Sequence, residues 1–268
     1  KEVLMIPIKE YEEKYNKAKY LYLEEHKTLT AISKELHMSR SRLSKKFKTE
    51  GIEIIHPQNY TKFNDTIFES IDTEEKAYWL GFLYADGSIS NTNNTIELSL
   101  KSSDINHLIK FKYFLGFEEN KHIFQDDVRC RFQFSNKKVK QDLCILGCIP
   151  KKSLILTFPT TNQVPSAFMK NFIRGYIDGD GCLHIKPNGS PYLSIAGTKE
   201  FLQGLLKTTN WKNNKIYNPP NTKIYTISWG GKYVLNYLDF IYENANIFLD
   251  RKYEKYQLLK KLDCRSKE

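Results

Sequence analysis

Two segments of this chain carry nearly the same pattern, Trp79-Leu80-Gly81-Phe82-Leu83-Tyr84-Ala85-Asp86-Gly87 and Phe172-Ile173-Arg174-Gly175-Tyr176-Ile177-Asp178-Gly179-Asp180-Gly181. Each is typical of the end of an apolar helix that carries two small residues one turn apart and closes on Asp-Gly. Small residues at that spacing, here Gly81 with Ala85 and Gly175 with Gly179, allow two helix backbones to approach closely. We therefore predict a helix pair with these four residues at its interface.

The same packing would bring together the acidic residues at the two helix ends. Asp86 and Asp180 would then lie side by side at the negative, C-terminal ends of their helices. Two carboxylates in that position repel each other, and a bound cation removes the repulsion. The pair is therefore predicted to form a divalent-metal site.

The two segments resemble the LAGLIDADG motifs of homing endonucleases, in the single-chain form that carries two motifs. Glycine stands at the third motif position in both copies, Gly81 and Gly175, and both copies end in Asp-Gly. The first copy departs from the family pattern because it has Tyr84 where the second keeps Asp178. The acid that matters in the family is the one before the last glycine, so the expected metal ligands are both present.

The sequences that follow the two motifs also repeat. In each half the motif precedes an alternating strand, a helical stretch, a second alternating strand and a closing helix. We expect these elements at 95–104, 105–115, 128–135 and 139–146, and again at 192–200, 201–206, 224–229 and 234–243. The predicted fold is α+β, with helices on one face of a sheet. By the resemblance, it is a pseudo-symmetric, duplicated αββαββα core whose antiparallel sheets form a DNA-binding saddle, and one chain suffices, so a monomer is expected.

The resemblance implies that Asp86 and Asp180 hold metal ions at the scissile phosphate. A main-chain carbonyl oxygen of Ala85 or Gly179 is expected as an additional ligand. An oxygen-only site with few protein ligands suits Mg²⁺, which keeps bound water and takes phosphate oxygens directly, and Mn²⁺ is expected to substitute.

Family members also place a basic residue near each metal site. Lys152 and Lys252 are the candidates here, because each follows the closing helix of its half. Contact with DNA phosphates alone is the alternative role for both lysines. Lys151 and Arg251 are the alternative residues.

Recognition of the DNA sequence is expected from the polar faces of the strands. In the strand at 128–135, Val128 and the other apolar residues are predicted to face the core, and the alternate polar residues to face outward. Outward-facing side chains of this kind suit base edges and phosphates, and a solvated face without DNA contacts is the alternative. The residues predicted to contact DNA are Arg129, Arg131, Gln133, Lys101, His184, Lys186, Thr226 and Ser228.

The N-terminal residues are predicted to form a small all-α domain that resembles a helix-turn-helix. A helix at 10–25 precedes two shorter helices whose connecting turn falls at His37. From Lys34 to Lys48 there are six basic residues and one acidic residue, so positive charge is concentrated where a DNA-reading helix would lie. A small helical domain with a solvated basic face is the alternative. The predicted DNA contacts of the second helix are Arg40, Arg42, Lys45 and Lys46.

These motifs set the expected domain boundaries. They are a helix-turn-helix domain at 1–50, a linker at 51–73, a first LAGLIDADG repeat at 74–160 and a second at 161–268. Tethering the small domain to the repeats is expected to lengthen the recognised site and to increase affinity.

Composition is consistent with a nucleic-acid partner. The chain has 268 residues, a net charge of +10 and an isoelectric point near 9.1, which favours double-stranded DNA as a polyanionic ligand. Five cysteines without CxxC spacing predict a reduced, cytoplasmic protein without structural zinc, in a bacterial or phage context or in an organelle. No apolar run approaches the ~20 residues of a membrane span, so no membrane partner is expected.

The predicted function is a site-specific homing endonuclease of an intron, an intein or a free-standing gene. It would make a Mg²⁺-dependent double-strand break at a long recognition site and leave short 3′ overhangs. Two alternatives remain, a non-cleaving transcription regulator on the same scaffold and an RNA maturase that assists intron splicing. Such regulators usually lose the metal-binding acids, which are present here. A helix-turn-helix favours duplex DNA, because the major groove of DNA admits a helix and that of RNA does not.

Overall fold

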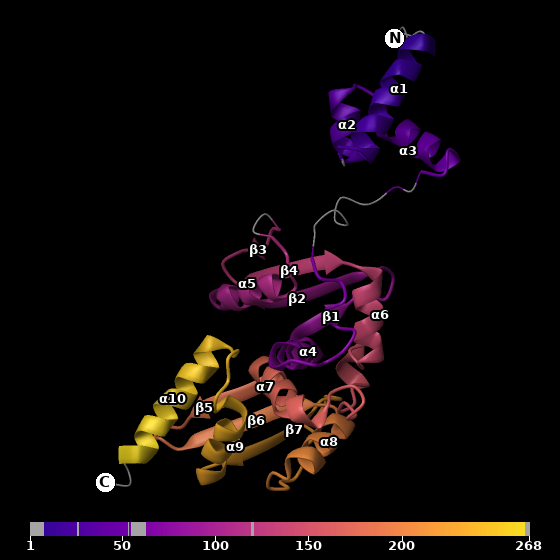
Figure 1. Cartoon of the computed structure of the whole chain (residues 1–268). Coiled ribbons are helices and arrows are strands. Elements are labelled where there is room, and N and C mark those ends of the chain that lie inside the picture. The colour runs from indigo at the N-terminus through magenta and orange to yellow at the C-terminus, as the bar shows by residue number, and fades with distance from the viewer. Residues whose placement is uncertain (1–7, 26, 53, 55–62, 119–120, 266–268) are drawn as a thin grey trace. The chain divides into compact units, whose positions relative to one another are not determined.

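The computed structural model describes residues 8–25, 27–52, 54, 63–118 and 121–265. The chain divides into two compact units, residues 1–62 and 63–268 (Figure 1). Among the described helices, none is both long enough and apolar enough to cross a membrane.

The described residues of the N-terminal unit form three helices. They are α1 (Ile8–Leu23), α2 (Leu29–Glu35) and α3 (Arg40–Thr49). The hydroxyl of Thr28 caps the first turn of α2. His37 has a left-handed φ of 52° in the turn before α3, a conformation that reverses the chain at a cost for a residue with a side chain. Phe47 of α3 packs edge-on against Tyr15 and Tyr22 of α1 and closes the small core of this unit.

The first half of the second unit alternates helices and antiparallel strands. Its elements are α4 (Glu74–Asp86), β1 (Gly87–Ile89), β2 (Thr95–Lys101), the 3₁₀ turn η2 (Ser102–Asp104), α5 (Ile105–Phe114), β3 (Phe124–Gln125), β4 (Arg129–Ser135) and α6 (Lys137–Ile145). The sheet order is β1-β2-β4-β3, with Leu98 opposite Phe132. Every second residue of β2 and β4 is buried, because one face of the sheet packs against α4 and α5.

The second half repeats this arrangement with one strand fewer. Its elements are α7 (Met169–Asp180), β5 (Gly181–Ile185), β6 (Pro191–Gly197), α8 (Lys199–Thr209), β7 (Tyr225–Gly230), α9 (Lys232–Tyr242) and α10 (Asp250–Arg265). The sheet order is β5-β6-β7, and all neighbours are antiparallel. The predicted α+β class with an internal repeat is confirmed.

The full αββαββα order is found in the first half alone among the described residues. In the second half, the position that corresponds to β3 holds a single bridge between Tyr217 and Thr226. Pro219 and Pro220 follow two residues after Tyr217, and proline has no amide hydrogen for pairing between strands. The second sheet is therefore narrower than predicted.

Part of the predicted linker packs with the repeats. The ring of Phe63 stacks on Phe117 with their centroids 4.4 Å apart, and Phe68 is fully buried. Residues 63–73 thus belong to the second unit, whereas residues 55–62 of the predicted linker lie outside the described residues.

A buried arginine joins the two halves of the second unit. Arg174 of α7 is fully buried and donates hydrogen bonds to the carbonyl oxygens of Ile247 and Ile241, each at 2.8 Å. Its remaining guanidinium nitrogen lies 2.6 Å from the carboxylate of Glu74 at the start of α4. The charge is therefore paired, and each of the three guanidinium nitrogens donates a hydrogen bond, which is what burying it requires.

Candidate functional site

The site is built on the contact between α4 and α7. A Cβ atom on Gly81 would overlap the carbonyl oxygen of Phe172 on the other helix, and a Cβ on Gly175 would overlap that of Tyr78. The backbones thus touch at both glycines. One turn further along, Gly179 lies directly against the side chain of Ala85. The structure brings together all four small residues of the two motifs.

The close contact places the two motif carboxylates next to each other. Asp86 and Asp180 are the last residues of α4 and α7, and both side chains reach solvent. Partial loss of hydration, together with the negative charge of Asp180, raises the pKa of Asp86 to about 6. Loss of hydration also raises the pKa of Asp180. Bringing the two carboxylates together therefore costs free energy that a bound cation would recover.

Two buried lysines lie at the same helix ends. Lys152 is in the 3₁₀ turn η3 (Lys152–Leu154), and its ammonium donates to the carbonyl oxygens of Ala85 at 3.3 Å and Gly87 at 2.5 Å. Lys252 lies in the first turn of α10 and is 3 % exposed. Each ammonium therefore offsets the negative end of a helix dipole.

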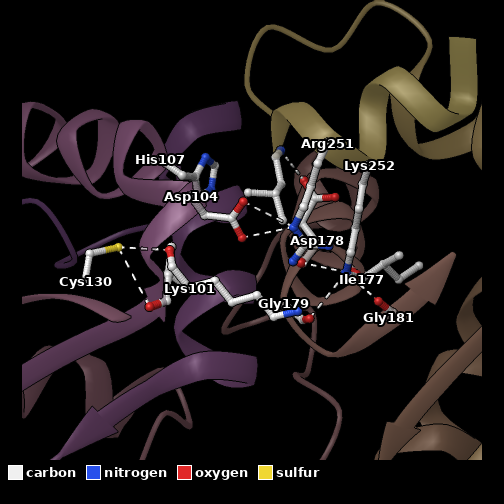
Figure 2. Close-up of polar contacts among 12 residues, drawn as sticks. Lys101, Asp104, His107, Cys130, Ile177, Asp178, Gly179, Gly181, Arg251 and Lys252 are labelled. Atoms are coloured by element: carbon white, nitrogen blue, oxygen red, sulfur yellow. Dashed lines mark hydrogen bonds and ion pairs between the residues drawn. The ribbon is translucent and has the colours of Figure 1, made fainter. Parts of the chain in front are cut away.

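Lys252 is held by more carbonyl groups than Lys152. Its ammonium donates to the carbonyl oxygens of Ile177 at 2.6 Å, Asp178 at 2.7 Å and Gly179 at 3.3 Å, and to that of Gly181 (Figure 2). Burial lowers the pKa of this lysine to about 8, and the carboxylates around it oppose that shift. One side chain from α10 thus donates hydrogen bonds to the carbonyl groups at the C-terminal end of α7.

The alternative basic residues point elsewhere. Lys151 is exposed and has a left-handed φ of 56°. The guanidinium of Arg251 donates to both carboxylate oxygens of Asp104, at 3.2 and 2.9 Å (Figure 2). Of the four candidates, Lys152 and Lys252 alone reach the motif helix ends.

Charges from the two halves are interleaved at the site. The lysine that lowers the pKa of Asp86 most is Lys252, which follows the second motif. For Asp180 it is Lys152, which follows the first. A hollow of about 280 Å³ is lined by Lys152 and Asp180, together with Tyr176. Both lysines therefore act electrostatically on both carboxylates, whereas the hydrogen bonds of each ammonium go to carbonyl groups of its own half.

The ligand set at the helix ends fits a hard divalent cation. Two adjacent carboxylates supply oxygen ligands and gain from a positive charge, and Mg²⁺ accepts few protein ligands because it keeps bound water. The carbonyl oxygens of Ala85 and Gly179 each accept a hydrogen bond of 3.3 Å from a lysine. Within the described part of the chain, no group of three or more His, Cys, Asp or Glu residues is placed to hold a metal. Any ligands beyond the carboxylates would be carbonyl oxygens, water or phosphate.

The polar residues of the first sheet share its outer face. Arg129, Arg131 and Gln133 of β4 are exposed and alternate with buried residues, and Lys101 of β2 lies opposite Arg129. The prediction for Val128 is wrong, because it precedes β4 and is 72 % exposed. The turn before β4 places it outside the alternation: the carboxylate of Asp126 accepts hydrogen bonds from the amides of residues 128 and 129.

The second sheet presents a smaller polar set. His184 and Lys186 are exposed, the former on β5 and the latter just beyond its end. Thr226 and Ser228 of β7 are half-buried. This face therefore offers fewer charged contacts than that of the first sheet.

The basic residues of α3 do not all point outward. Arg40, Arg42 and Lys45 are exposed, as expected for a helix that meets a polyanion. The ammonium of Lys46 instead lies 3.8 Å from the ring centroid of Tyr15 on α1, and this side chain is half-buried. Lys46 thus takes part in packing within the unit.

A buried polar network behind the site was missed by the sequence reasoning. Asp178 is fully buried and accepts hydrogen bonds from the hydroxyls of Tyr78 and Tyr242. The signal available in the sequence is a second acid inside an apolar motif helix. Tyr176, which stands where the first motif has Phe82, was also missed. Its hydroxyl donates to a carbonyl oxygen of β6, and its proximity opposes the rise in the pKa of Asp180 that lost hydration causes.

No family model matches this sequence. The chain is 26% identical over 232 residues to the probable translation initiation factor IF-2 of Methanocaldococcus jannaschii, and the match covers 76% of this chain but only 18% of that protein.

Among solved structures, the I-LtrWI LAGLIDADG homing endonuclease bound to target DNA is 15% identical, with a TM-score of 0.48 over 75% of this chain and 92% of that one. The LAGLIDADG homing endonuclease I-GzeII in complex with its DNA target is 11% identical, with a TM-score of 0.49 over 74% and 92%. Similarity at these levels leaves the function to be inferred from the site itself.

Proposed function

We propose that this chain is a site-specific, divalent-metal-dependent DNA endonuclease. It makes a double-strand break at a long recognition site, leaves short 3′ overhangs and acts as a monomer. The proposal rests on one observation: Asp86 and Asp180 lie together at the ends of two touching helices, with a buried lysine at each end. The resemblance of both helices to LAGLIDADG motifs supports the same conclusion.

The chemistry requires an activated water, a neutralised phosphate and a stabilised 3′ leaving oxygen. Divalent cations supply all three when they are bound at the scissile phosphate. Asp86 and Asp180 would hold Mg²⁺, with a carbonyl oxygen of Ala85 or Gly179 as a further ligand. Lys152 and Lys252 fix the orientation of the carbonyl groups around the two carboxylates and limit the negative charge that accumulates there.

The sheet faces would bind the DNA duplex. The guanidinium groups of Arg129 and Arg131 and the amide of Gln133 carry paired hydrogen-bonding groups that match base edges in the major groove, whereas the ammonium of Lys101 suits phosphates. In the second half, the corresponding contacts would come from His184, Lys186, Thr226 and Ser228.

The N-terminal unit would add a second DNA contact. Arg40, Arg42 and Lys45 are the exposed basic residues of α3 on which this proposal depends. Tethering two binding units increases affinity and lengthens the recognised site without a new contact at either one.

The test is a cleavage assay on a library of randomised DNA duplexes, with Mg²⁺, with Ca²⁺ and with EDTA. We expect discrete products with 3′ overhangs that appear with Mg²⁺ and not with EDTA. Asp86→Asn and Asp180→Asn should each lower the rate of double-strand cleavage by about 1,000-fold, because metal-held charge contributes several kcal/mol to the transition state. DNA binding should remain.

Asp126→Asn is the matched control, because Asp126 is an exposed acid outside the site. This variant should cleave like the parent protein. Selective binding without cleavage by the parent protein would replace the proposal with a non-cleaving regulator. Selective binding of a structured intron RNA in place of duplex DNA would point to a maturase.

A further inference from the structure

The carboxylate of Asp178 joins α7 to the start of α10. Its Oδ2 accepts hydrogen bonds from the hydroxyl of Tyr78 and from the amide of Leu249, each at 2.8 Å, and its Oδ1 accepts one from the hydroxyl of Tyr242 at 2.5 Å. Asp178 is fully buried, so these three donors replace the water that the carboxylate gave up.

The main chain of Leu249 determines the position of Lys252. The amide of Lys252 donates to the carbonyl oxygen of Leu249 at 2.9 Å, which makes the first helical turn of α10. The Lys252 ammonium returns to the main-chain carbonyl oxygen of Asp178 at 2.7 Å (Figure 2). Asp178 therefore contacts the segment at both ends of this turn, with its carboxylate at Leu249 and its carbonyl group at Lys252.

The first half has no equivalent of this carboxylate. Tyr84 occupies the matching motif position, and its hydroxyl donates to the carbonyl oxygen of Leu146 at 2.5 Å. Lys152 bonds to two carbonyl groups, those of Ala85 and Gly87, and its turn receives no hydrogen bond from Tyr84 in the described contacts. The two lysines are thus placed by different means.

The Asp178 network also extends into the first half of the unit. Tyr78 belongs to α4, and its hydroxyl lies 3.0 Å from Nε2 of His107 on α5. Because the hydroxyl proton goes to Asp178, we assign the imidazole proton to Nε2, which leaves Nδ1 as the buried atom without a partner. The network therefore connects α5, α4, α7 and the start of α10.

We propose that Asp178 is a positioning residue that acts through Lys252. In this proposal the acid of each motif serves one DNA strand together with the lysine held at its own helix end. Cleavage of the strand served by Lys252 then depends on Asp178, and cleavage of the strand served by Lys152 does not. The statement about catalytic sites rests on the proposed endonuclease function. The statement about the position of Lys252 does not.

The position of Lys252 can be tested without any cleavage. Brief treatment of the full chain with an amine-acetylating reagent, followed by mass spectrometry, reports how accessible each lysine is. In Asp178→Asn, three donors face a side chain that now carries an NH₂ group, so one donor loses its acceptor. We expect acetylation of Lys252 to rise at least about tenfold, since an unsatisfied buried donor shifts local opening by that factor. Acetylation of Lys152 should not change.

Two further variants separate positioning from charge and from unfolding. Tyr242→Phe keeps the carboxylate and removes one of its three hydrogen bonds, so it should raise Lys252 acetylation by a smaller factor. Tyr84→Phe, the matched change in the first half, should leave Lys252 unchanged. A thermal unfolding curve of each variant shows whether global unfolding accounts for a signal, and a rise in Lys152 and Lys252 together would overturn the proposal. So would an Asp178→Asn protein with protected Lys252.

A supercoiled plasmid that carries the recognition site tests the catalytic consequence. Asp178→Asn should accumulate nicked circles, whereas the parent protein and Tyr84→Phe should give linear product. Equal loss of cleavage on both strands would overturn the claim that one site alone depends on Asp178. If the parent protein does not cut at all, the endonuclease proposal fails, and the acetylation result still decides the role of Asp178.

Discussion

The four charged side chains at the ends of α4 and α7 are compatible with folding because they compensate one another. Asp86 and Asp180 repel each other and the helix dipoles, whereas Lys152 and Lys252 lower the pKa of both carboxylates. The compensation is incomplete, since the pKa of Asp86 remains raised to about 6. The remaining cost comes first from the lost hydration of Asp86 and then from the charge of Asp180, and it falls where a cation would bind.

Neutralising one carboxylate should therefore stabilise the metal-free protein. The pKa of Asp86 is higher in the folded than in the unfolded state, so its ionisation costs stability as pH rises from about 4 to about 6. Without metal, Asp86→Asn should raise stability at pH 8 by about 0.5 kcal/mol, or about 1–2 °C in Tm, because the carboxylate still reaches solvent. At pH 4 the difference should vanish.

Thermal unfolding in EDTA at both pH values measures this difference. Asp126→Asn is a control for which the opposite change in stability is expected, because hydrogen bonds from two backbone amides lower the pKa of Asp126. That variant should lose stability at pH 8. A lower Tm for Asp86→Asn than for the parent protein at pH 8 would show that the two motif carboxylates are not in conflict.

At the scale of elements, the distance between α4 and α7 is set by backbone contacts. A methyl group on Gly81 would meet a carbonyl oxygen of the opposite helix, which cannot rotate away as a side chain can. Gly81→Ala should therefore lower stability by about 3 kcal/mol or more and the Tm by about 6–12 °C, because overpacking here must separate the helices.

Gly230→Ala is the matched control for this substitution. The nearest atom to a Cβ at Gly230 is a carbonyl oxygen at 3.9 Å, an ordinary van der Waals distance. This variant should change stability by no more than about 0.5 kcal/mol. Equal effects of the two substitutions in a thermal melt would contradict a close backbone contact at Gly81.

The helix pair could be predicted because its cause lies in local sequence. Small residues one turn apart determine how closely two helices approach, and the Asp-Gly ends determine which side chains then meet. The α+β class followed from alternating strands for a similar reason, although Pro219 and Pro220 remove one strand from the second sheet. Features that depend on nearby residues in the sequence could therefore be predicted.

Features that depend on residues far apart in the sequence could not be predicted from it. The buried state of Asp178 requires hydroxyls from Tyr78 and Tyr242, which are far from it in sequence. The inward direction of Lys46 depends on Tyr15 in a different helix, and nothing in the basic pattern of α3 distinguishes it from Lys45. Side-chain direction was predicted where periodicity sets it and missed where tertiary contacts do.

For the whole molecule, both units are predicted to contact DNA, each through different elements. The repeats contain the candidate site and two polar sheet faces, and the N-terminal unit offers one exposed basic helix. A net charge of +10 favours any polyanion, so charge alone does not identify which residues contact DNA. The salt dependence of binding distinguishes phosphate contacts from general attraction, since each lost contact lowers the slope by about one.

In the full chain, the double variant Arg42→Ala/Lys45→Ala should weaken binding to the cognate duplex by about tenfold or more and reduce the slope of log K against log salt by about two. Cleavage at saturating protein should be unchanged, because these residues lie in the N-terminal unit and the candidate site lies in the other.

Filter binding across a salt series measures the slope, and Lys17→Ala, which changes an exposed lysine of α1, is the control. An unchanged slope in the double variant would mean that α3 makes no phosphate contact. An equal loss with Lys17→Ala would mean that the unit attracts DNA only through its overall charge, and recognition would then rest on the sheets alone.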